Sequence, residues 1–410
     1  MNPTENLAPE TPPLTEFIPL IVPEIRGNEW EYVKDCLETN WVSSVGTYVD
    51  RFEKLTAERV GTKYAVATVN GTAALHIALM LAGVETNDEV LVSTLTFIAP
   101  ANAVRYVGAW PVFIDAEPKY WQIDPARVID FLENDCRWDG HTLVNRRTGR
   151  RVKAILPVHI LGHPADLDPI LEIAAKYSVA VIEDATEGLG ARYRGKSLGS
   201  FGQSACFSFN GNKIITTGGG GMLVTDDARI AKRAKYLTTQ AKDDPIEYVH
   251  NEIGYNYRLT NVLAAIGCAQ MEQLDTFVQT KREIARRYKE SLSAVPGIQI
   301  SSEADWAYAT YWMYTVLIDE SESGLSSRDL LRELDARRIQ TRPLWQPIHR
   351  SLAHPQAGSP SCPVADLLYA KALSLPCSVG LTCFAQDQVI EAVKSILAKN
   401  QKTAEAPRSA

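Results

Sequence analysis

Short β-branched runs alternate with amphipathic helical patterns through the first two thirds of the chain. Apolar residues recur at helical spacing over 74–84, 99–108 and 168–177. Five runs have the length and composition of buried strands: 65–69, 89–93, 111–115, 154–158 and 179–184. This repetition predicts an α/β fold with a mostly parallel, doubly wound sheet.

A different pattern begins near Asn261. One helical pattern runs over 262–292, and it is followed by a strand at 311–318 and helices at 327–338 and 386–398. We therefore expect two domains, a large one over 18–260 and, over 261–398, a connecting helix with a smaller α/β domain.

Three segments depart from these patterns. Charged residues at about 133–152 interrupt the alternation of strand and helix, which predicts a surface insertion. Residues 1–17 are rich in Pro, Thr and Glu, and the tail 399–410 is similar, so we expect both to be disordered.

Composition excludes several classes of function. The net charge is -7 and no basic arm is present, which argues against a nucleic-acid partner. The first residues lack the basic start and apolar core of a signal peptide, and no apolar run is long enough to cross a bilayer. The 7 cysteines are scattered and odd in number, as is typical of reduced thiols. We expect a cytoplasmic protein without a membrane partner.

The stretch SFNGNKIITTGGGG, residues 208–221, places Lys213 before four glycines. A nucleotide-phosphate loop needs the glycines before the lysine and Ser or Thr after it, so this spacing excludes such a loop. Partial burial between two strand-like runs would make the amine available as a nucleophile. A lysine whose head reaches water is the commoner case, so the hypothesis of a reactive lysine needs further residues. We expect the glycines to allow close backbone packing beside Lys213.

Further residues of this kind occur earlier in the chain. Asp184 ends a strand, where open α/β sheets bind ligands, although it could equally cap the next helix. Gly71 and Thr72 open a helix, where a phosphate can bind, and Ser208 offers another hydroxyl. Phe97 could stack on a flat ring or belong to the core. Together they follow the order that a pyridoxal phosphate enzyme requires.

A metal site is a weaker hypothesis. The candidate ligands, two histidines and two aspartates, surround a Gly and a Pro that would interrupt the helix needed to align them. We therefore expect a structural loop and no metal here. The candidates are His159, His163, Asp166 and Asp168.

Several motifs resemble the DegT/DnrJ-type sugar aminotransferases. They are GTAAL, the TF pair at 96–97, VHILG, EDATE, SFNGNK with GGGGM, and GYNYRLTN. The resemblance extends from about Ile18 to Leu397, and it is greatest to the 4-aminotransferases of legionaminic acid and N-acetylbacillosamine synthesis. It implies a fold-type I aminotransferase with pyridoxal 5'-phosphate as cofactor, working as a homodimer with sites at the subunit interface.

The resemblance also implies a role for each matching residue. Lys213 would form the covalent link to the cofactor and shuttle the proton, while Asp184 would pair with the ring nitrogen. Six further contacts are implied: Phe97 stacks on the ring, Gly71, Thr72 and Ser208 hold the phosphate, Glu187 bonds the ring hydroxyl, and Asn256 reaches the partner subunit's cofactor.

The implied reaction moves the amino group of L-glutamate to C4 of a nucleotide-linked 4-keto-6-deoxyhexose. A UDP- or GDP-linked 2-acetamido-4-keto sugar is the expected substrate, and a GDP-perosamine-synthase-like 4-aminotransferase is the alternative. Related dehydratases carry histidine in place of the lysine, and non-catalytic homologues would be expected to lose Lys213 or Asp184. Both residues are present. The choice of nucleotide, the substituent on C2 and the configuration of the new amine stay open.

Overall fold

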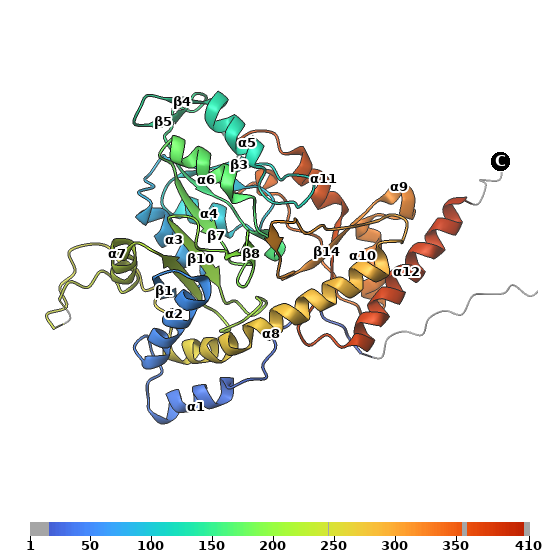
Figure 1. Cartoon of the computed structure of the whole chain (residues 1–410), viewed down its shortest axis with the longest axis horizontal. Coiled ribbons are helices and arrows are strands. Elements are labelled where there is room, and N and C mark those ends of the chain that lie inside the picture. The colour runs from blue at the N-terminus through green and yellow to red at the C-terminus, as the bar shows by residue number, and fades with distance from the viewer. Residues whose placement is uncertain (1–15, 245, 355–358, 406–410) are drawn as a thin grey trace, which may run out of the picture.

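The computed structural model describes residues 16–244, 246–354 and 359–405. A seven-stranded sheet forms its centre (Figure 1). In spatial order its strands are β1 (Tyr64–Thr68), β11 (Gly221–Thr225), β10 (Ser204–Ser208), β7 (Ala180–Asp184), β6 (Val152–Leu156), β2 (Glu89–Ser93) and β3 (Trp110–Ile114). All five predicted strands occur in it within two residues of their expected bounds.

The central sheet is mostly parallel, as predicted. The neighbouring pairs from β10 through β7, β6 and β2 to β3 are parallel. Strand β11 is antiparallel to both β1 and β10, and the sequence analysis did not predict it. Its five residues begin with the last glycine of the run and are all buried. The glycine run predicts a turn, so nothing in the sequence indicated a strand that starts there.

Helices cover both faces of the sheet, because alternate residues of each strand point to opposite sides. In β2, for example, Val90 and Val92 face one core and Leu91 faces another. One face carries α3 (Gly71–Leu81), α4 (Ala99–Tyr106) and α7 (Ala228–Thr238). The other carries α2 (Thr47–Val60), α5 (Pro125–Asp130), α6 (Leu167–Lys176) and the first half of α8 (Asn261–Leu292), with α1 (Glu29–Glu38) packed on α8.

Helix α8 joins this layer to a second, smaller sheet (Figure 1). Its 32 residues span roughly 48 Å. The smaller sheet has the order β12 (Ile298–Ile300), β14 (Tyr314–Ile318) and β15 (Ala372–Leu375). Its core is shared with α8, α10 (Ser327–Ala336) and α12 (Cys383–Glu405), and α9 (Glu320–Ser323) and α11 (Pro363–Lys371) complete this part. The expected division into two domains at residue 260 stays a prediction.

The segment near 133–152 forms a surface hairpin of β4 (Cys136–Trp138) and β5 (Leu143–Asn145) after a π-helical turn at Phe131–Asp135. The hairpin is anchored on Glu89, which is fully buried. Asn145 Nδ2 donates to one oxygen of this carboxylate at 2.8 Å, and Thr148 Oγ1 donates to the other at 2.7 Å. The remaining strands, β8 (Arg192–Tyr193), β9 (Lys196–Ser197) and β13 (Ala307–Tyr308), form a small separate sheet.

The two ends of the chain differ from expectation in one respect. Helix α12 continues to Glu405, so residues 399–405 are helical where a disordered tail was predicted. The helical pattern at 386–398 continues into residues that are mostly good helix formers (Lys, Gln, Ala and Glu), which carry the helix about two more turns. The other parts of the predicted disordered ends, 1–15 and 406–410, lie outside the described residues.

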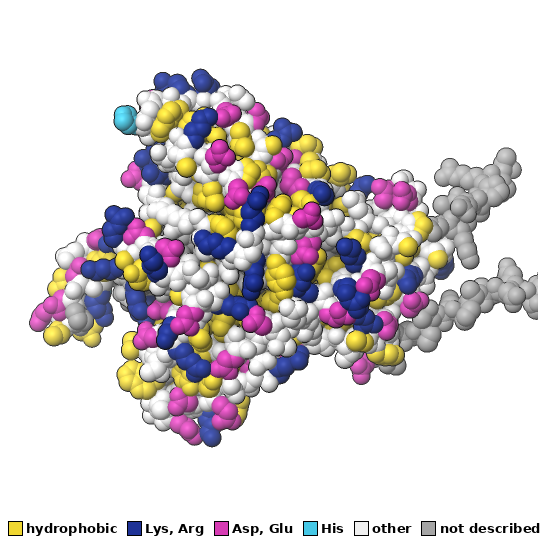
Figure 2. Space-filling view, viewed as in Figure 1, with side chains coloured by type: hydrophobic (Ala, Val, Ile, Leu, Met, Phe, Trp, Pro, Cys, Tyr) yellow, Lys and Arg dark blue, Asp and Glu magenta, His cyan; other side chains and the backbone are white. Residues whose placement is uncertain are grey.

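On the face that Figure 2 shows, charges of both signs are interspersed. Within the described ranges, no helix combines the length and the apolar character that spanning a bilayer requires. Interspersed charge of this kind is typical of a surface that contacts water.

Candidate active site

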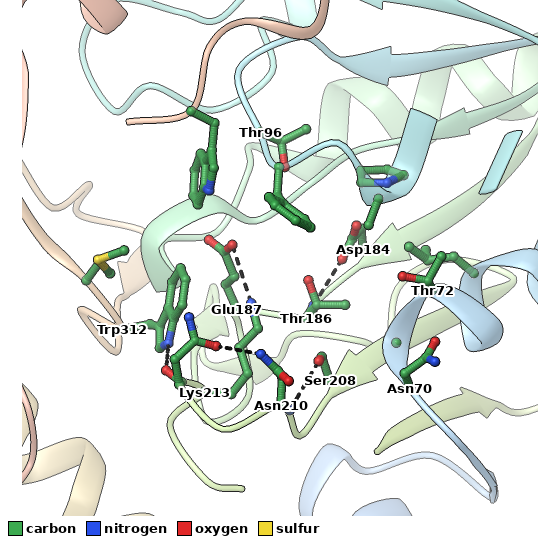
Figure 3. A pocket seen from close by; sticks show the side chains of 18 residues that line it. Asn70, Thr72, Thr96, Asp184, Thr186, Glu187, Ser208, Asn210, Lys213 and Trp312 are labelled. Carbon is green, nitrogen blue, oxygen red and sulfur yellow. Dashed lines mark hydrogen bonds and ion pairs between the residues drawn. The ribbon is translucent and has the colours of Figure 1, made fainter. Parts of the chain in front are cut away.

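A cavity of about 380 Å³ opens at the carboxyl ends of the central strands (Figure 3). Side chains from the central sheet, from its loops and from the chain next to the smaller sheet line it, and most of the residues singled out in the sequence are among them. The central sheet and its loops contribute Gly71, Thr72, Phe97, Asp184, Glu187, Ser208 and Lys213, and the region of the smaller sheet contributes Trp312, Met313 and Trp345.

Lys213 lies in the loop that follows β10, which turns back so that the Lys213 N–H donates to Asn210 O at 3.0 Å. Its side chain is 13% exposed, and Nζ lies 3.5 Å from Glu187 Oε1. The ammonium also sits 4.1 Å from the centre of the Trp312 ring, an arrangement that stabilises a cation. The amine is therefore held inside the cavity, so the interpretation of Lys213 as a solvated surface lysine is wrong.

Two buried carboxyl groups face the same space. Asp184 ends β7, is 2% exposed, and accepts the Thr186 N–H at 3.1 Å. Glu187 is 5% exposed and accepts the Leu161 N–H at 2.8 Å. Burial raises the pKa of Asp184, and it raises the pKa of Glu187 to about 7, although the Lys213 charge opposes both shifts. The site thus holds two buried carboxyl groups, Asp184 and Glu187, and the single positive charge of Lys213 can neutralise only one of them.

The phosphate turn predicted at Gly71 is the N-terminus of α3. Asn70 caps this helix, because its side chain accepts the Ala73 N–H at 2.8 Å. A Cβ on Gly71 would lie 3.0 Å from Ser208 Cβ and 3.1 Å from Thr186 Cγ2, so a larger residue would close the space in front of the helix. Thr72 and Ser208 line the same end of the cavity.

The glycine run packs against this turn. A Cβ on Gly221 would collide with the backbone carbonyl group of Asn70. The absence of a side chain therefore lets β11 pass directly beside the start of α3. The close packing at Gly221 is therefore against Asn70 and not beside Lys213 as expected, and a Cβ on Gly218 or Gly219 would meet no atom within 4 Å.

Phe97 lines the cavity and is 56% exposed. A core aromatic would be buried, so the core interpretation of Phe97 is wrong. An exposed ring at a cavity wall is suited to stacking against a flat ligand.

The sequence analysis missed an aromatic wall of the cavity, formed by Trp312 and Trp345. Trp312 is fixed by its Nε1–H, which donates to Asn212 O at 2.6 Å, and its ring lies parallel to that of Trp345 at 6.4 Å. The available signals were the aromatic run YWMY before a predicted strand and the isolated Trp in TRPLWQP. Neither signal shows that these segments return to the carboxyl ends of strands more than 100 residues earlier.

Two further groups of predicted residues do not line the cavity. Asn256 is exposed, pairs with Thr239 through a β-bridge, and does not line the cavity.

His159 contacts Glu183 at 3.3 Å, and that carboxylate also accepts backbone N–H groups from the loop after β9. Burial lowers the pKa of His163 to about 4, and its ring bridges Pro164 O and the Ala304 N–H. These histidines organise loops, and the searched part of the chain contains no cluster of three or more candidate metal ligands.

The geometry fits a flat, phosphorylated and cationic ligand. Asp184 is a buried carboxylate that forms no ion pair with any residue of the described ranges. The start of α3 provides N–H groups for a phosphate, and Phe97 offers a ring face. Lys213 supplies an amine that can bond covalently to a carbonyl group.

Comparison with known proteins gives a consistent result. Residues 23–394 match the DegT/DnrJ/EryC1/StrS aminotransferase family. The GDP-perosamine synthase of Caulobacter vibrioides is 40% identical over 93% of this chain and 98% of its own length. EpsN of Bacillus subtilis, named as a pyridoxal phosphate-dependent aminotransferase, is 39% identical over 90% of this chain and 93% of its own. The aminotransferase TlmJ of Streptoalloteichus hindustanus superposes with a TM-score of 0.84 at 28% identity, over 93% of this chain and 99% of that one. The chain belongs to the DegT/DnrJ/EryC1/StrS aminotransferase family, whose members are pyridoxal phosphate-dependent sugar aminotransferases.

Proposed function

We propose that the protein transfers the amino group of L-glutamate to C4 of a nucleotide-linked 4-keto-6-deoxyhexose. The observation that carries this proposal is that one cavity holds the Lys213 amine beside both Glu187 and the Trp312 ring and is also lined by Asp184 and the start of α3. This arrangement serves amino transfer because one amine can act on both the donor and the acceptor.

The residues of the cavity fit pyridoxal 5'-phosphate. Gly71, Thr72 and Ser208 would hold the phosphate, Asp184 would pair with the protonated ring nitrogen, and Phe97 would cover one ring face. When bound, this cofactor supplies an electron-poor ring that withdraws charge from the carbon undergoing deprotonation. A buried, unpaired Asp184 favours that state, since its negative charge stabilises a positive ring nitrogen in a medium of low dielectric constant.

Lys213 then moves protons between carbon atoms. Its amine accepts the proton from Cα of the amino donor and later delivers a proton to C4 of the sugar. Glu187, with a pKa of about 7, lies 3.5 Å away and holds the free amine between these steps. The Trp312 ring limits the access of water to the amine from the opposite side.

Two sugar substrates deserve direct comparison. Two relatives named GDP-perosamine synthase, at 40% and 38% identity, favour a GDP-linked substrate without an acetamido group. The motif resemblance to 4-aminotransferases of 2-acetamido sugars supports a UDP- or GDP-linked 2-acetamido-4-keto sugar instead. In either case the sugar would lie against Trp312 and Trp345, which line the cavity.

The proposal includes a homodimer in the cytoplasm. Asn256 is exposed in the single chain and is therefore free to reach a partner subunit's cofactor. Exposed apolar side chains near it, Ile246, Tyr248 and Ile253, would be covered by such an interface. All seven cysteines are free thiols, which suits a reducing compartment.

The test uses the purified holoenzyme with L-glutamate and three 4-keto-6-deoxy sugars: the GDP-linked sugar, and the UDP- and GDP-linked 2-acetamido sugars. We expect one of them to yield a 4-amino product, identified by NMR, and we expect Lys213→Ala to abolish turnover. Lys176→Ala, at an exposed lysine of α6, is the matched control. A wild-type protein that binds the cofactor but aminates none of the three would refute the proposed substrate class. Full activity of Lys213→Ala would refute the role of the lysine.

A further inference from the structure

Helix α8 carries a lysine that is enclosed by the fold. Lys281 is 2% exposed, and its amine makes one hydrogen bond within the described ranges, to the carbonyl oxygen of Cys377 at 2.5 Å. No carboxylate that the structure describes forms an ion pair with this amine, and burial lowers its pKa. Removing an ammonium group from water is costly when no anion balances it, so an apolar side chain would be the cheaper choice here.

The carbonyl group that Lys281 binds belongs to a buried segment of the smaller sheet. Residues 372–379, which comprise β15 and the four residues after it, are all buried. Tyr288, also on α8, donates its hydroxyl to Pro376 O at 2.8 Å. Two side chains of α8 therefore hold two consecutive carbonyl groups just beyond the end of β15.

Cys377 lies across from Trp312. Strands β14 and β15 are antiparallel with Tyr314 opposite Leu375, and the same register places Trp312 opposite Cys377. The Cys377 thiol donates to Trp312 O at 3.7 Å, a weak hydrogen bond that agrees with this register. Val379 belongs to the same apolar cluster as Trp312. The segment after β15 is therefore a direct support of Trp312.

Trp312 in turn contacts the catalytic amine. Its ring centre lies 4.1 Å from Lys213 Nζ, and its Nε1–H donates to Asn212 O in the residue before that lysine. A shift of Trp312 would change both contacts, because the attraction between a cation and a ring depends on their distance. We infer that Lys281 is a positioning residue for amino transfer, whose buried amine holds the segment at Cys377 so that Trp312 keeps its place beside Lys213. This inference rests on the proposed function of Lys213.

The half-reaction of the holoenzyme with L-glutamate tests this role, because it needs no sugar and is followed by cofactor absorbance. The variants are Lys281→Met, Trp312→Leu and the double variant, each measured in a single turnover. Methionine fills a similar volume without a charge, so we expect Lys281→Met to fold. We expect Lys281→Met to slow the reaction about fivefold and Trp312→Leu about tenfold. The double variant should also be slowed only about tenfold, because Lys281 acts through Trp312.

Two further variants separate positioning from a general loss of stability. Lys281→Gln keeps an N–H donor on a shorter side chain and should retain more of the rate than Lys281→Met. It replaces Lys281→Met in the comparison with Trp312→Leu if the methionine variant does not fold. Ser327→Ala removes a buried hydrogen bond to Ala370 O, and it should lower the urea midpoint without changing the rate. Equal slowing by Ser327→Ala would overturn the inference.

The position of Trp312 can also be observed without the cofactor. A crystal structure of cofactor-free Lys281→Met should show the Trp312 ring displaced relative to Lys213, and an unmoved ring would overturn the inference. An unchanged rate in Lys281→Met would do the same, as would a double variant slowed about fiftyfold, since independent effects multiply. A wild-type holoenzyme that does not react with L-glutamate would refute the proposed function, and the role of Lys281 with it.

Discussion

Replacing Glu187 by Gln should remove a specific part of the protein's pH dependence. Burial raises the pKa of Glu187 from 4.5 to about 7 in the folded, cofactor-free chain. One pKa unit corresponds to about 1.4 kcal/mol, so complete ionisation of this carboxyl costs the folded state roughly 3 kcal/mol relative to the unfolded chain. Glutamine keeps the oxygen that accepts the Leu161 N–H and has no such cost.

The sign of the effect follows from proton binding. The folded protein binds the Glu187 proton more tightly than the unfolded chain, so the free energy of unfolding falls as pH rises from about 4.5 to 7. Between pH 6 and 8.5, above the isoelectric point near 5.6, linkage predicts a loss of about 1.4 kcal/mol through this one group.

Urea denaturation of cofactor-free protein at pH 6, 7 and 8.5 measures this loss. Wild type should lose about 1.4 kcal/mol more stability over that interval than Glu187→Gln, since the pH dependence of Asp184 is common to both proteins. Glu133→Gln, at a surface glutamate of the π-helical turn, should behave as wild type. Parallel pH profiles for wild type and Glu187→Gln would refute the raised pKa of this carboxyl and its place in the mechanism.

Three further changes test other parts of the structure. Gly71→Val should weaken binding of pyridoxal phosphate at least tenfold in an absorbance titration, because the new side chain meets Ser208 and Thr186; Gly71→Ala should be milder. Trp312→Leu removes the ring beside the Lys213 ammonium, and a loss of ~1.4 kcal/mol would slow single-turnover amino transfer about tenfold, while Trp312→Phe should retain most of the rate. Asn145→Ala removes one donor from buried Glu89, so urea denaturation should show a loss of about 1–3 kcal/mol; an unchanged midpoint would show that the hairpin is not anchored there.

The residues proposed to act on the cofactor could be predicted from the sequence, because each of them is marked by residue type and by its place next to a strand or helix. Asp184 ends β7, Gly71 begins α3 and Lys213 lies in the loop directly after β10, and parallel strands bring their carboxyl ends to one edge of a sheet. Strand-end position and residue type are both readable from sequence. These three residues therefore converge where the predicted topology requires.

The residues proposed to contact the sugar could not be predicted in the same way. Trp312 and Trp345 reach the cavity only because α8 carries the chain away and the smaller sheet packs back against the central one. That arrangement depends on packing between segments far apart in sequence, which no local pattern records. Strand β11 was missed for a related reason. The glycines at its start are typical of a turn, and the segment forms a strand because it pairs with β1 and β10.

The split origin of the cavity walls has an evolutionary consequence. The groups proposed to act on the cofactor and the proton all come from the central sheet and its loops, whereas the aromatic surface proposed to meet the sugar comes from the chain after α8. Substitutions at Met313 or Trp345 can therefore alter which sugar fits without disturbing Lys213, Asp184 or the turn at Gly71, whereas a substitution at Trp312 also changes the surroundings of the Lys213 amine. A fold divided in this way lets one catalytic apparatus diversify across many acceptor sugars.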